Sequence, residues 1–477
     1  MSSFSTYLNK LREDRKLKVV ELAKLCGFDV STTSRWCNGK RLPTSDQVID
    51  IITECLQLSY KESVQLEQAY LENVFGPEKY GNYKIIEELV RFFDKESSFL
   101  TKRKSFTSQQ SIKQEALYFE NCSSHIAVLE AMDHVIGSVG QEETLYVKIT
   151  DPTLNILSLI TKEILLSPKR KAKILFVFSE DDGSNASITS ILLKSIVEIM
   201  LHCENISVSM LNEELDPFMK EENWIFTEKV FLRFDAQIQR GAITNYSAYI
   251  KNQQIAYEYL KKDSHEVAQK FMSVLDYPET FSKKDHIDSF EYMPCFTTYM
   301  NHDLLDRSFY QQLPDRDGLI QSILSSYHFE ENKKYDVHNL CSEEGLRSFM
   351  ENGIIAIFPY PIYHPLSLED RIMLLEKLIH AVDLGNCKQL FMKEQILHNY
   401  PVIQVDLYEN ENSPIVSLMI IEGNELNTHR LIFRHPSIVQ CVRDYFEVAK
   451  HPRFTYTKEE SREILQKVLE EYKDKRL

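Results

Sequence analysis

Apolar residues recur at helical spacing along the first 75 residues, with polar residues between them. This period of about 3.6 residues predicts amphipathic helices. A Ser-x-x-Glu pair at residues 59 and 62 is typical of a capped helix start. Five helices are predicted, over residues 5–15, 21–25, 30–37, 48–56 and 59–74.

The pattern changes in the middle of the chain, where strand-like and helix-like segments alternate. Continuous apolar runs such as residues 173–179 are typical of strands buried on both faces. The alternation predicts an α/β layer with a partly parallel sheet. Strands are predicted over residues 144–150, 173–179, 206–211 and 228–234, and helices over 152–166, 186–200 and 246–281.

The last third of the chain is mixed. Three strand-like runs with polar turns between them predict an antiparallel unit. We find no repeat of fixed period. Strands are predicted over residues 353–358, 402–407, 415–421 and 428–433, and helices over 343–352, 368–384, 437–451 and 458–472.

The most specific pattern lies in residues 19–43. A short helix ends at Gly27, a residue that readily adopts positive φ. Asp29 is suited to cap a second helix, which Asn38 and Gly39 then stop. Two helices joined by such a short turn form a helix-turn-helix unit, whose second helix enters the major groove of DNA.

This stretch resembles the DNA-binding domain of lambda-repressor and Cro-like (XRE) transcriptional regulators, over about residues 6–60. The family pattern is L-x-x-L-R, then E-L-A-x-x-x-G, then S-T-I-S-R-W-E-N-G-x-x-x-P. Matching positions are Leu8, Leu11-Arg12, Glu21-Leu22-Ala23, Gly27, Ser31-Thr32, Ser34-Arg35-Trp36, Asn38-Gly39 and Pro43.

Three positions depart from the family pattern. Val19 stands where the family often has a Gln that helps to anchor a phosphate. Thr33 replaces a larger apolar residue, and Cys37 replaces Glu. The resemblance still implies a DNA-binding domain. The predicted DNA-binding residues are Lys18, Val30, Ser31, Thr32, Ser34, Arg35, Asn38, Lys40 and Arg41.

These side chains suit their predicted roles. Short polar groups and a guanidinium in the second helix can contact base edges, and Val30 can contact a thymine methyl group. Lys40 and Arg41 are placed to contact phosphates. The alternative is a helix-turn-helix unit that serves only as a protein interaction module.

A chain of 477 residues exceeds one compact core, so several domains are expected. The fold class predicted is multidomain, with an all-α helix-turn-helix N-terminal domain and a larger α/β (mixed α+β) body. The domains are predicted as residues 1–75 for DNA binding, 76–114 as a linker with a helix, and 115–300 and 301–477 for sensing or dimerisation.

Charge and cysteine usage narrow the class of protein. The formal net charge is −16, whereas residues 1–60 carry nine Lys and Arg against seven Asp and Glu. Only the N-terminal domain is therefore expected to bind nucleic acid.

The nine cysteines lack a C-x-x-C pair, which favours reduced thiols in the cytoplasm. No apolar run approaches about 18 residues, and residues 1–10 lack a signal core, so no membrane partner is predicted.

The body offers weaker candidates. The basic run at residues 168–173 is either a nucleic-acid patch or, as we favour, a solvated turn. The acidic run at 179–184 is either a cation or amine site or, as we favour, a capped loop. Aromatics near 290–299 and 358–363 either line a pocket or belong to the core.

No catalytic group, metal site or cofactor is predicted. The fourteen histidines show no H-E-x-x-H or other paired spacing. We expect a sequence-specific transcriptional regulator, not an enzyme, that binds a pseudo-palindromic operator in double-stranded DNA as a homodimer and responds to a small-molecule or peptide effector. The alternative is an enzyme or a mobile-element accessory protein with a DNA-targeting N-terminal domain.

Overall fold

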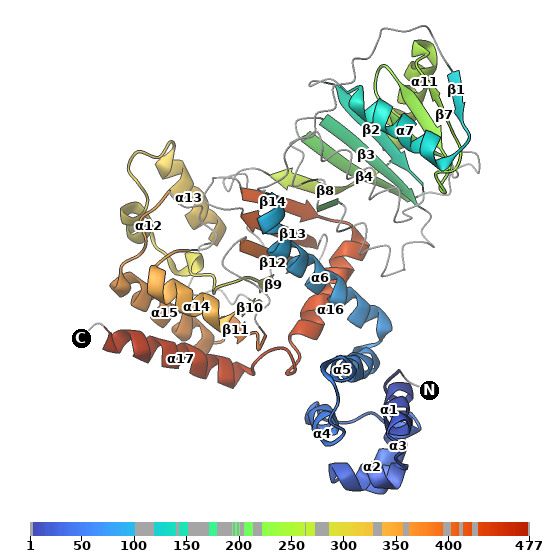
Figure 1. Cartoon of the computed structure of the whole chain (residues 1–477). Coiled ribbons are helices and arrows are strands. Elements are labelled where there is room, and N and C mark those ends of the chain that lie inside the picture. Colours follow the sequence, from blue (N-terminus) through green and yellow to red (C-terminus); the bar gives the residue numbers. More distant parts are fainter. Residues whose placement is uncertain are drawn as a thin grey trace.

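The computed structural model begins with five short helices that form the N-terminal domain (Figure 1). The structure describes residues 3–475 except 101–118, 140–142, 151–170, 179–192, 194–195, 198–199, 201–204, 213–221, 263, 272–285, 328–335, 356–361, 395–401, 410–413 and 422–427. We call α1 to α5 the head. They are α1 (Ser3–Asp14), α2 (Val19–Cys26), α3 (Val30–Cys37), α4 (Gln47–Cys55) and α5 (Tyr60–Phe75).

The turn between α2 and α3 follows the sequence prediction closely. Gly27 adopts φ 73°, the left-handed conformation that a side chain disfavours. The Asp29 carboxylate accepts a hydrogen bond from the Thr32 amide at 3.0 Å and caps α3. At the end of α2, Leu25 is 50% exposed, whereas the next residue, Cys26, is buried.

A long helix, α6 (Pro77–Leu100), leaves the head directly after Gly76, whose φ is 86°. It packs against α16 (Pro436–Ala449) near the end of the chain. Tyr83 stacks on Tyr445 with ring centroids 5.4 Å apart. The Asn82 side chain donates to the Asp444 carboxylate at 2.7 Å. The region predicted as a linker with a helix therefore begins as a helix that is fixed to the body and extends to Leu100.

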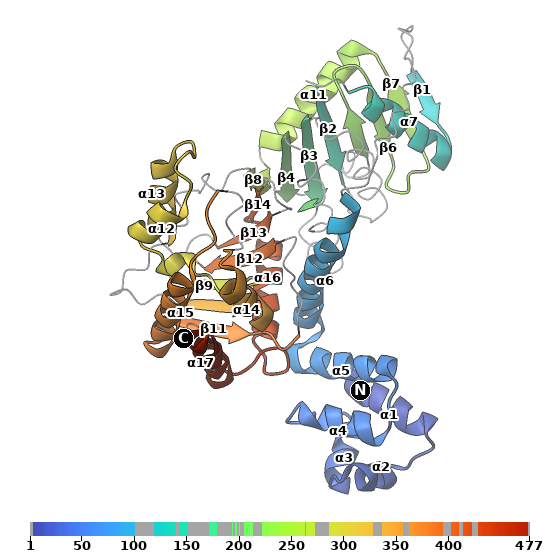
Figure 2. The ribbon, with the colours of Figure 1, turned by 60° about the vertical axis from the view of Figure 1, so that its left-hand side comes forward.

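Among the described residues, fourteen strands form one mixed sheet, with order β1-β7-β6-β5-β2-β3-β4-β8-β14-β13-β12-β9-β10-β11 (Figure 2). The strands are β1 (Phe119–Cys122), β2 (Thr144–Ile149), β3 (Lys171–Phe178), β4 (Asn205–Asn212), β5 (Asn223–Phe226), β6 (Phe231–Phe234), β7 (Gly241–Thr244), β8 (His265–Phe271), β9 (His286–Phe290), β10 (Asp336–Cys341), β11 (Cys387–Phe391), β12 (Val402–Glu409), β13 (Ile415–Ile421) and β14 (Thr428–Phe433).

The sheet consists of two units with the same topology. β2, β3 and β4 are parallel, as are β9, β10 and β11. Antiparallel strands β5, β6, β7 and β1 extend the first unit, and β12, β13, β14 and β8 extend the second in the same order. The antiparallel β4–β8 pair joins the units. The boundary predicted at residue 300 falls inside the second unit, between β9 and β10.

Helices cover the sheet. α7 (His125–Gly137) and α11 (Ser247–Lys262) lie on opposite faces of the first unit (Figure 2). α16 packs on β12 and β13 of the second unit, while α15 and α17 pack at β11. The remaining described helices are η3 (Thr297–Tyr299), α12 (His302–Ser308), α13 (Arg316–Tyr327), α14 (Glu343–Asn352), α15 (Leu368–Asp383) and α17 (Lys458–Asp474). No helix in the described part of the chain has the length and apolar character that a membrane crossing requires.

The predicted fold class is confirmed: a helical N-terminal domain precedes a body of mixed sheet and helices. The predicted helix over residues 246–281 is wrong at His265–Phe271, which forms β8 between β4 and β14. Residues 272–281 lie outside the described residues. The predicted helix at 152–166, the acidic run at 179–184 and residues 356–358 of the predicted strand at 353–358 lie outside the described residues.

Candidate nucleic-acid interface

Helix α3 presents one face to the head core and the other to solvent. Thr33, Trp36 and Cys37 are buried, and the Trp36 ring meets Phe28 edge to face at 5.1 Å. Among the residues predicted to contact DNA, Val30 is 42% exposed, Ser31 and Arg35 are exposed, and Thr32 and Ser34 are half-buried. The buried face fixes the helix, so the opposite face is presented in one orientation.

Three of the residues predicted to contact DNA already form side-chain hydrogen bonds within the head. The Ser31 hydroxyl donates to the Asp29 carboxylate at 2.5 Å, and this bond, with the Thr32 amide, lowers the pKa of Asp29. The Asn38 amide group lies 3.3 Å from the Ser34 hydroxyl, to which it donates. Arg35 is therefore the most available polar side chain on this face of α3.

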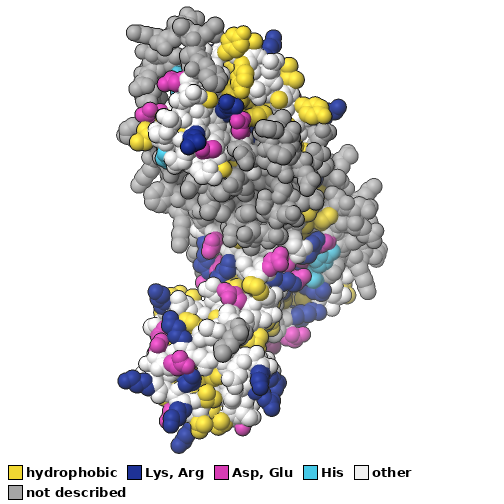
Figure 3. Space-filling model, turned by 90° about the vertical axis from the view of Figure 1, so that its right-hand side faces the viewer, with side chains coloured by type: hydrophobic (Ala, Val, Ile, Leu, Met, Phe, Trp, Pro, Cys, Tyr) yellow, Lys and Arg dark blue, Asp and Glu magenta, His cyan; other side chains and the backbone are white. Residues whose placement is uncertain are grey.

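Exposed cations lie at the start of α2 and directly after α3. Lys40 and Arg41 are exposed directly after α3, and Lys18 is exposed at the start of α2, where its amide donates to Glu21 at 2.7 Å. Figure 3 shows Lys and Arg side chains around the outer surface of the head. The described structure thus brings the predicted residues to one end of the head. A positive surface beside a fixed helix can hold a polyanion.

Sequence reasoning misses the residues that position α3. The Asn9 side chain donates to the Cys37 carbonyl at 2.7 Å and ties the end of α3 to α1. Arg12 donates to the Leu17 carbonyl at 2.7 Å and fixes the loop before α2. Arg12 stands in the L-x-x-L-R pattern, but the pattern gives no partner for it.

The body contacts the head on the opposite side. Arg453 donates to Asp50 of α4 at 2.9 Å and to Glu67 of α5 at 2.6 Å. His451 lies 3.6 Å from Asp46, and its ring meets Phe75 edge to face at 5.2 Å. We call these contacts of residues 451 and 453 the head anchor. Figures 1 and 2 show α2 and α3 at the end of the head farthest from the body, so the anchor leaves this surface accessible.

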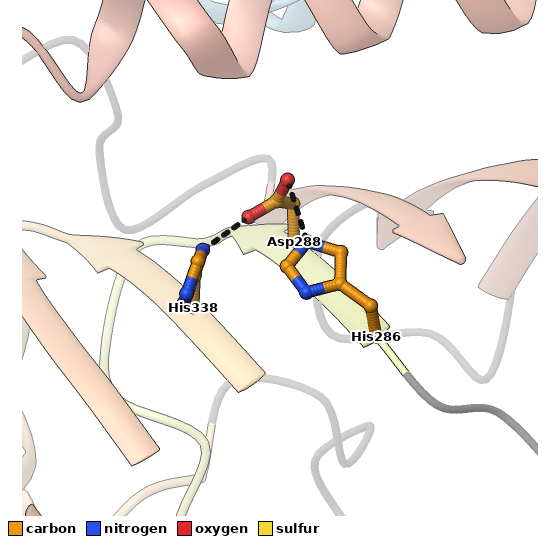
Figure 4. A group of neighbouring side chains, drawn as sticks. All are labelled: His286, Asp288 and His338. Carbon is orange, nitrogen blue, oxygen red and sulfur yellow. Dashed lines mark hydrogen bonds and ion pairs between the residues drawn. The ribbon is translucent and has the colours of Figure 1, made fainter. Parts of the chain in front are cut away.

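A cluster of two histidines and one aspartate lies on the body sheet, beneath the end of α16 (Figure 4). His286 Nε2 is 3.2 Å, and His338 Nδ1 is 3.1 Å, from the Asp288 carboxylate. Lys450, the C-terminal cap of α16, forms an ion pair with the same carboxylate. Burial raises the pKa of Asp288, but the two histidine hydrogen bonds and the lysine charge outweigh it and hold the pKa well below its ordinary value.

A layer of buried polar side chains lies on the opposite face of this part of the sheet, on β9, β10 and β12. Burial raises the pKa of Glu291, and the nearby Asp406 carboxyl raises it further. Burial also raises the pKa of Asp406, against the opposing effect of a 2.7 Å hydrogen bond from Ser289. Asn339 donates to Glu291, and Gln404 donates to Asp406 at 2.9 Å. Both carboxyls thus have partners within the sheet.

Comparison with known proteins supports the assignment of the head. A model described as a helix-turn-helix domain matches residues 3–59. The HTH-type transcriptional repressor RghR of Bacillus subtilis (strain 168) is 38% identical over 74 residues, which cover 16% of this chain and 54% of that protein. This chain thus spans about half the length of the curated relative. The head is therefore an XRE-like helix-turn-helix domain.

Two solved structures share weak similarity with the chain. The archaeal chromatin protein TrmBL2, whose structure is described as showing a novel mode of DNA binding, has 10% identity and a TM-score of 0.23, with 53% of this chain and 88% of that chain covered. The phosphatidylserine synthase of Haemophilus influenzae Rd KW20 has 10% identity and a TM-score of 0.22, with 77% and 94% covered. At these TM-scores neither structure carries an argument about the body.

Proposed function

We propose that the chain is a cytoplasmic, sequence-specific DNA-binding transcriptional regulator that reads its site with α3. The observation that carries the proposal is the position of Arg35. Its side chain is exposed on a helix fixed by buried Trp36, with the cations Lys40 and Arg41 at the helix end. An Arg in the major groove reads guanine, and flanking cations hold phosphates.

Selection of DNA fragments by the full-length protein tests this function. Random duplexes are bound at moderate salt, recovered and sequenced over several rounds. We expect one enriched motif, and we expect Arg35→Ala to alter that motif at particular bases. Enrichment of no motif by the folded protein would contradict sequence-specific reading.

We further propose that two copies act together on a pseudo-palindromic site. One α3 reads about three to five base pairs, which is too few against the competing sites of a genome. A two-fold pair of helices spaced by about 34 Å doubles the contacts. Sedimentation of the full-length protein with and without the selected duplex tests this, and a strictly monomeric complex would contradict it.

We propose that the body regulates the head in response to an effector, rather than acting as an enzyme. The head anchor supports this role, since Arg453 and His451 of the body hold α4 and α5. An effector that shifts residues 451–453 therefore changes how the head is held. A selected DNA motif that is bound with unchanged affinity across metabolite, metal and peptide libraries would favour the alternative, an enzyme or mobile-element accessory protein.

A further inference from the structure

The His–Asp–His cluster is built by the register of two parallel strands. Asp288 of β9 lies directly opposite His338 of β10, and His286 is two residues before Asp288, on the same face of β9. The three potential ligand atoms all lie within 4.8 Å of one another. We propose that these residues bind a divalent transition-metal ion and that the ion competes with the Lys450 ammonium for Asp288.

The donor set fits this class of ion. Two imidazole nitrogens and a carboxylate oxygen suit Zn²⁺ and its neighbours in the first transition row, and three protein ligands leave a position for water or another ligand. Zinc bonds of about 2.0–2.2 Å place neighbouring ligand atoms roughly 3.3 Å apart in a tetrahedral site. His286 Nε2 lies 3.2 Å from Oδ2 of Asp288, and His338 Nδ1 lies 3.1 Å from Oδ1, so each His–Asp pair is already close to that spacing.

The protons around His338 show why the ammonium and a metal are alternatives. Lys388 Nζ lies 2.6 Å from Nε2 of His338, and an ammonium only donates, so Nε2 accepts and the ring proton is on Nδ1. Nδ1 then donates to Asp288 but cannot also accept from Lys450, whose Nζ is 2.9 Å away. A metal on Nδ1 needs the lone pair of that nitrogen, so the ring proton moves to Nε2. The ion therefore binds when the Lys450 ammonium leaves Asp288 and the exposed Lys388 side chain turns away from Nε2.

Displacement of Lys450 can affect the head through the residues that follow it in the chain. Lys450 is the C-cap of α16, and His451 and Arg453 of the head anchor follow it within three residues. The Lys393 ammonium, which contacts the Pro452 carbonyl at 2.6 Å, holds the same segment on the body. Release of Lys450 therefore loosens the segment that carries the anchor. This regulatory part rests on the proposed DNA-binding function, whereas the metal site itself does not.

Calorimetric titration of the tag-free, full-length protein with Zn²⁺ tests the site. We expect one ion per chain. Asp288→Ala should weaken binding by more than about 100-fold, since loss of even an indirect partner of a metal ligand costs roughly 10–100-fold. His302→Ala, at an exposed histidine on α12, is the matched control and should bind as the parent does. Absence of binding, or equal binding by Asp288→Ala, would overturn the site.

A variant that should bind more tightly separates a true effect on the site from a loss of binding through misfolding. Lys450→Gln removes the competing charge and should bind Zn²⁺ roughly tenfold more tightly, because a cation beside the site opposes the ion. An unfolded protein cannot imitate that gain at one ion per chain. Weaker or unchanged binding by folded Lys450→Gln would show that ammonium and ion do not compete.

Hydrogen exchange of the full-length protein tests the link to the head. Zn²⁺ should speed amide exchange in α4 near Asp46 and Asp50, and Lys450→Gln should do the same without metal. Unchanged exchange in both cases would refute the link. Neither readout uses DNA, so a protein that passes these tests but selects no DNA motif would retain the metal site and lose the proposed function.

Discussion

The guanidinium of Arg453 holds both carboxylate oxygens of Asp50, at 2.9 and 3.0 Å, across a separation of 403 residues. The same side chain donates to Glu67 at 2.6 Å. The last part of the chain therefore holds the first part, although α6 already joins head and body covalently. A head held at two places has a defined orientation, which a pair of recognition helices requires.

Removal of this anchor should free the head without unfolding the body. Arg453→Ala should lower the free energy of unfolding by less than about 1 kcal/mol, because such partly exposed ion pairs contribute little. It should nevertheless speed amide exchange in α4 clearly. The matched control is Arg462→Ala, which breaks a similar two-bond contact with Asp383 elsewhere in the body. Equal exchange of α4 in the two variants would contradict the anchor.

The cations at the end of α3 should set the salt dependence of DNA binding. The double substitution Lys40→Ala/Arg41→Ala should weaken binding to all sequences and flatten the plot of log affinity against log salt by about two, roughly one per lost phosphate contact. Lys458→Ala, at an exposed lysine at the start of α17, should leave the slope unchanged. A parent-like slope in the double variant would place the phosphate contacts elsewhere.

Arg35 should determine base preference. Loss of a bidentate contact with guanine costs about 1–3 kcal/mol of discrimination at that base pair. Arg35→Ala should therefore lower the preference at one or two positions of the selected motif and leave the other positions intact. Competition binding with single-base variants of the motif measures this. A uniform loss of affinity for all duplexes would make Arg35 a phosphate contact instead.

The buried carboxyl of Glu291 should make stability depend on pH. Burial, and secondly the Asp406 carboxyl, raises the folded-state pKa of Glu291 well above its ordinary value. The folded protein therefore holds a proton that the unfolded chain loses above about pH 4.3, so this contribution to stability falls as pH rises beyond that value.

Glu291→Gln keeps a side-chain oxygen for the hydrogen bond from Asn339 and removes the ionisable carboxyl group. Chemical unfolding between pH 5 and pH 9 should show a smaller loss of stability with rising pH than in the parent. Glu344→Gln, at an exposed residue of α14, should follow the parent curve. An equal loss in Glu291→Gln and the parent would show that the carboxyl is already ionised in the fold.

The sequence predicts those parts of the fold that depend on local pattern. β13 (Ile415–Ile421) and β14 (Thr428–Phe433) have the predicted bounds, because each contains an apolar run and polar stretches of sequence precede both strands. The pattern of β8 predicts a helix, since its strand conformation depends on pairing with β4 and β14. The pattern also misses β9, because polar His286 and Asp288 occupy one of its faces and do not indicate a buried strand.

The two candidate sites differ in how far apart their residues lie along the chain. The residues of α3 lie within one short segment, so the local helix-turn-helix pattern is sufficient to place them together. Asp288 and His338 are 50 residues apart and meet only through the parallel register of β9 and β10. The Lys450 contact spans 162 residues. Spacing rules for metal ligands on one helix or loop cannot detect such a cluster.

The proposed function depends on α3 reading a DNA sequence. The most direct measurement is the ratio of affinities of the full-length protein for the selected duplex and for a scrambled duplex of equal composition, by fluorescence anisotropy at near-physiological salt. We expect a ratio of at least about 10³, the lower range for specific regulators, and a marked fall of this ratio with Arg35→Ala. Equal affinities for the two duplexes would contradict it.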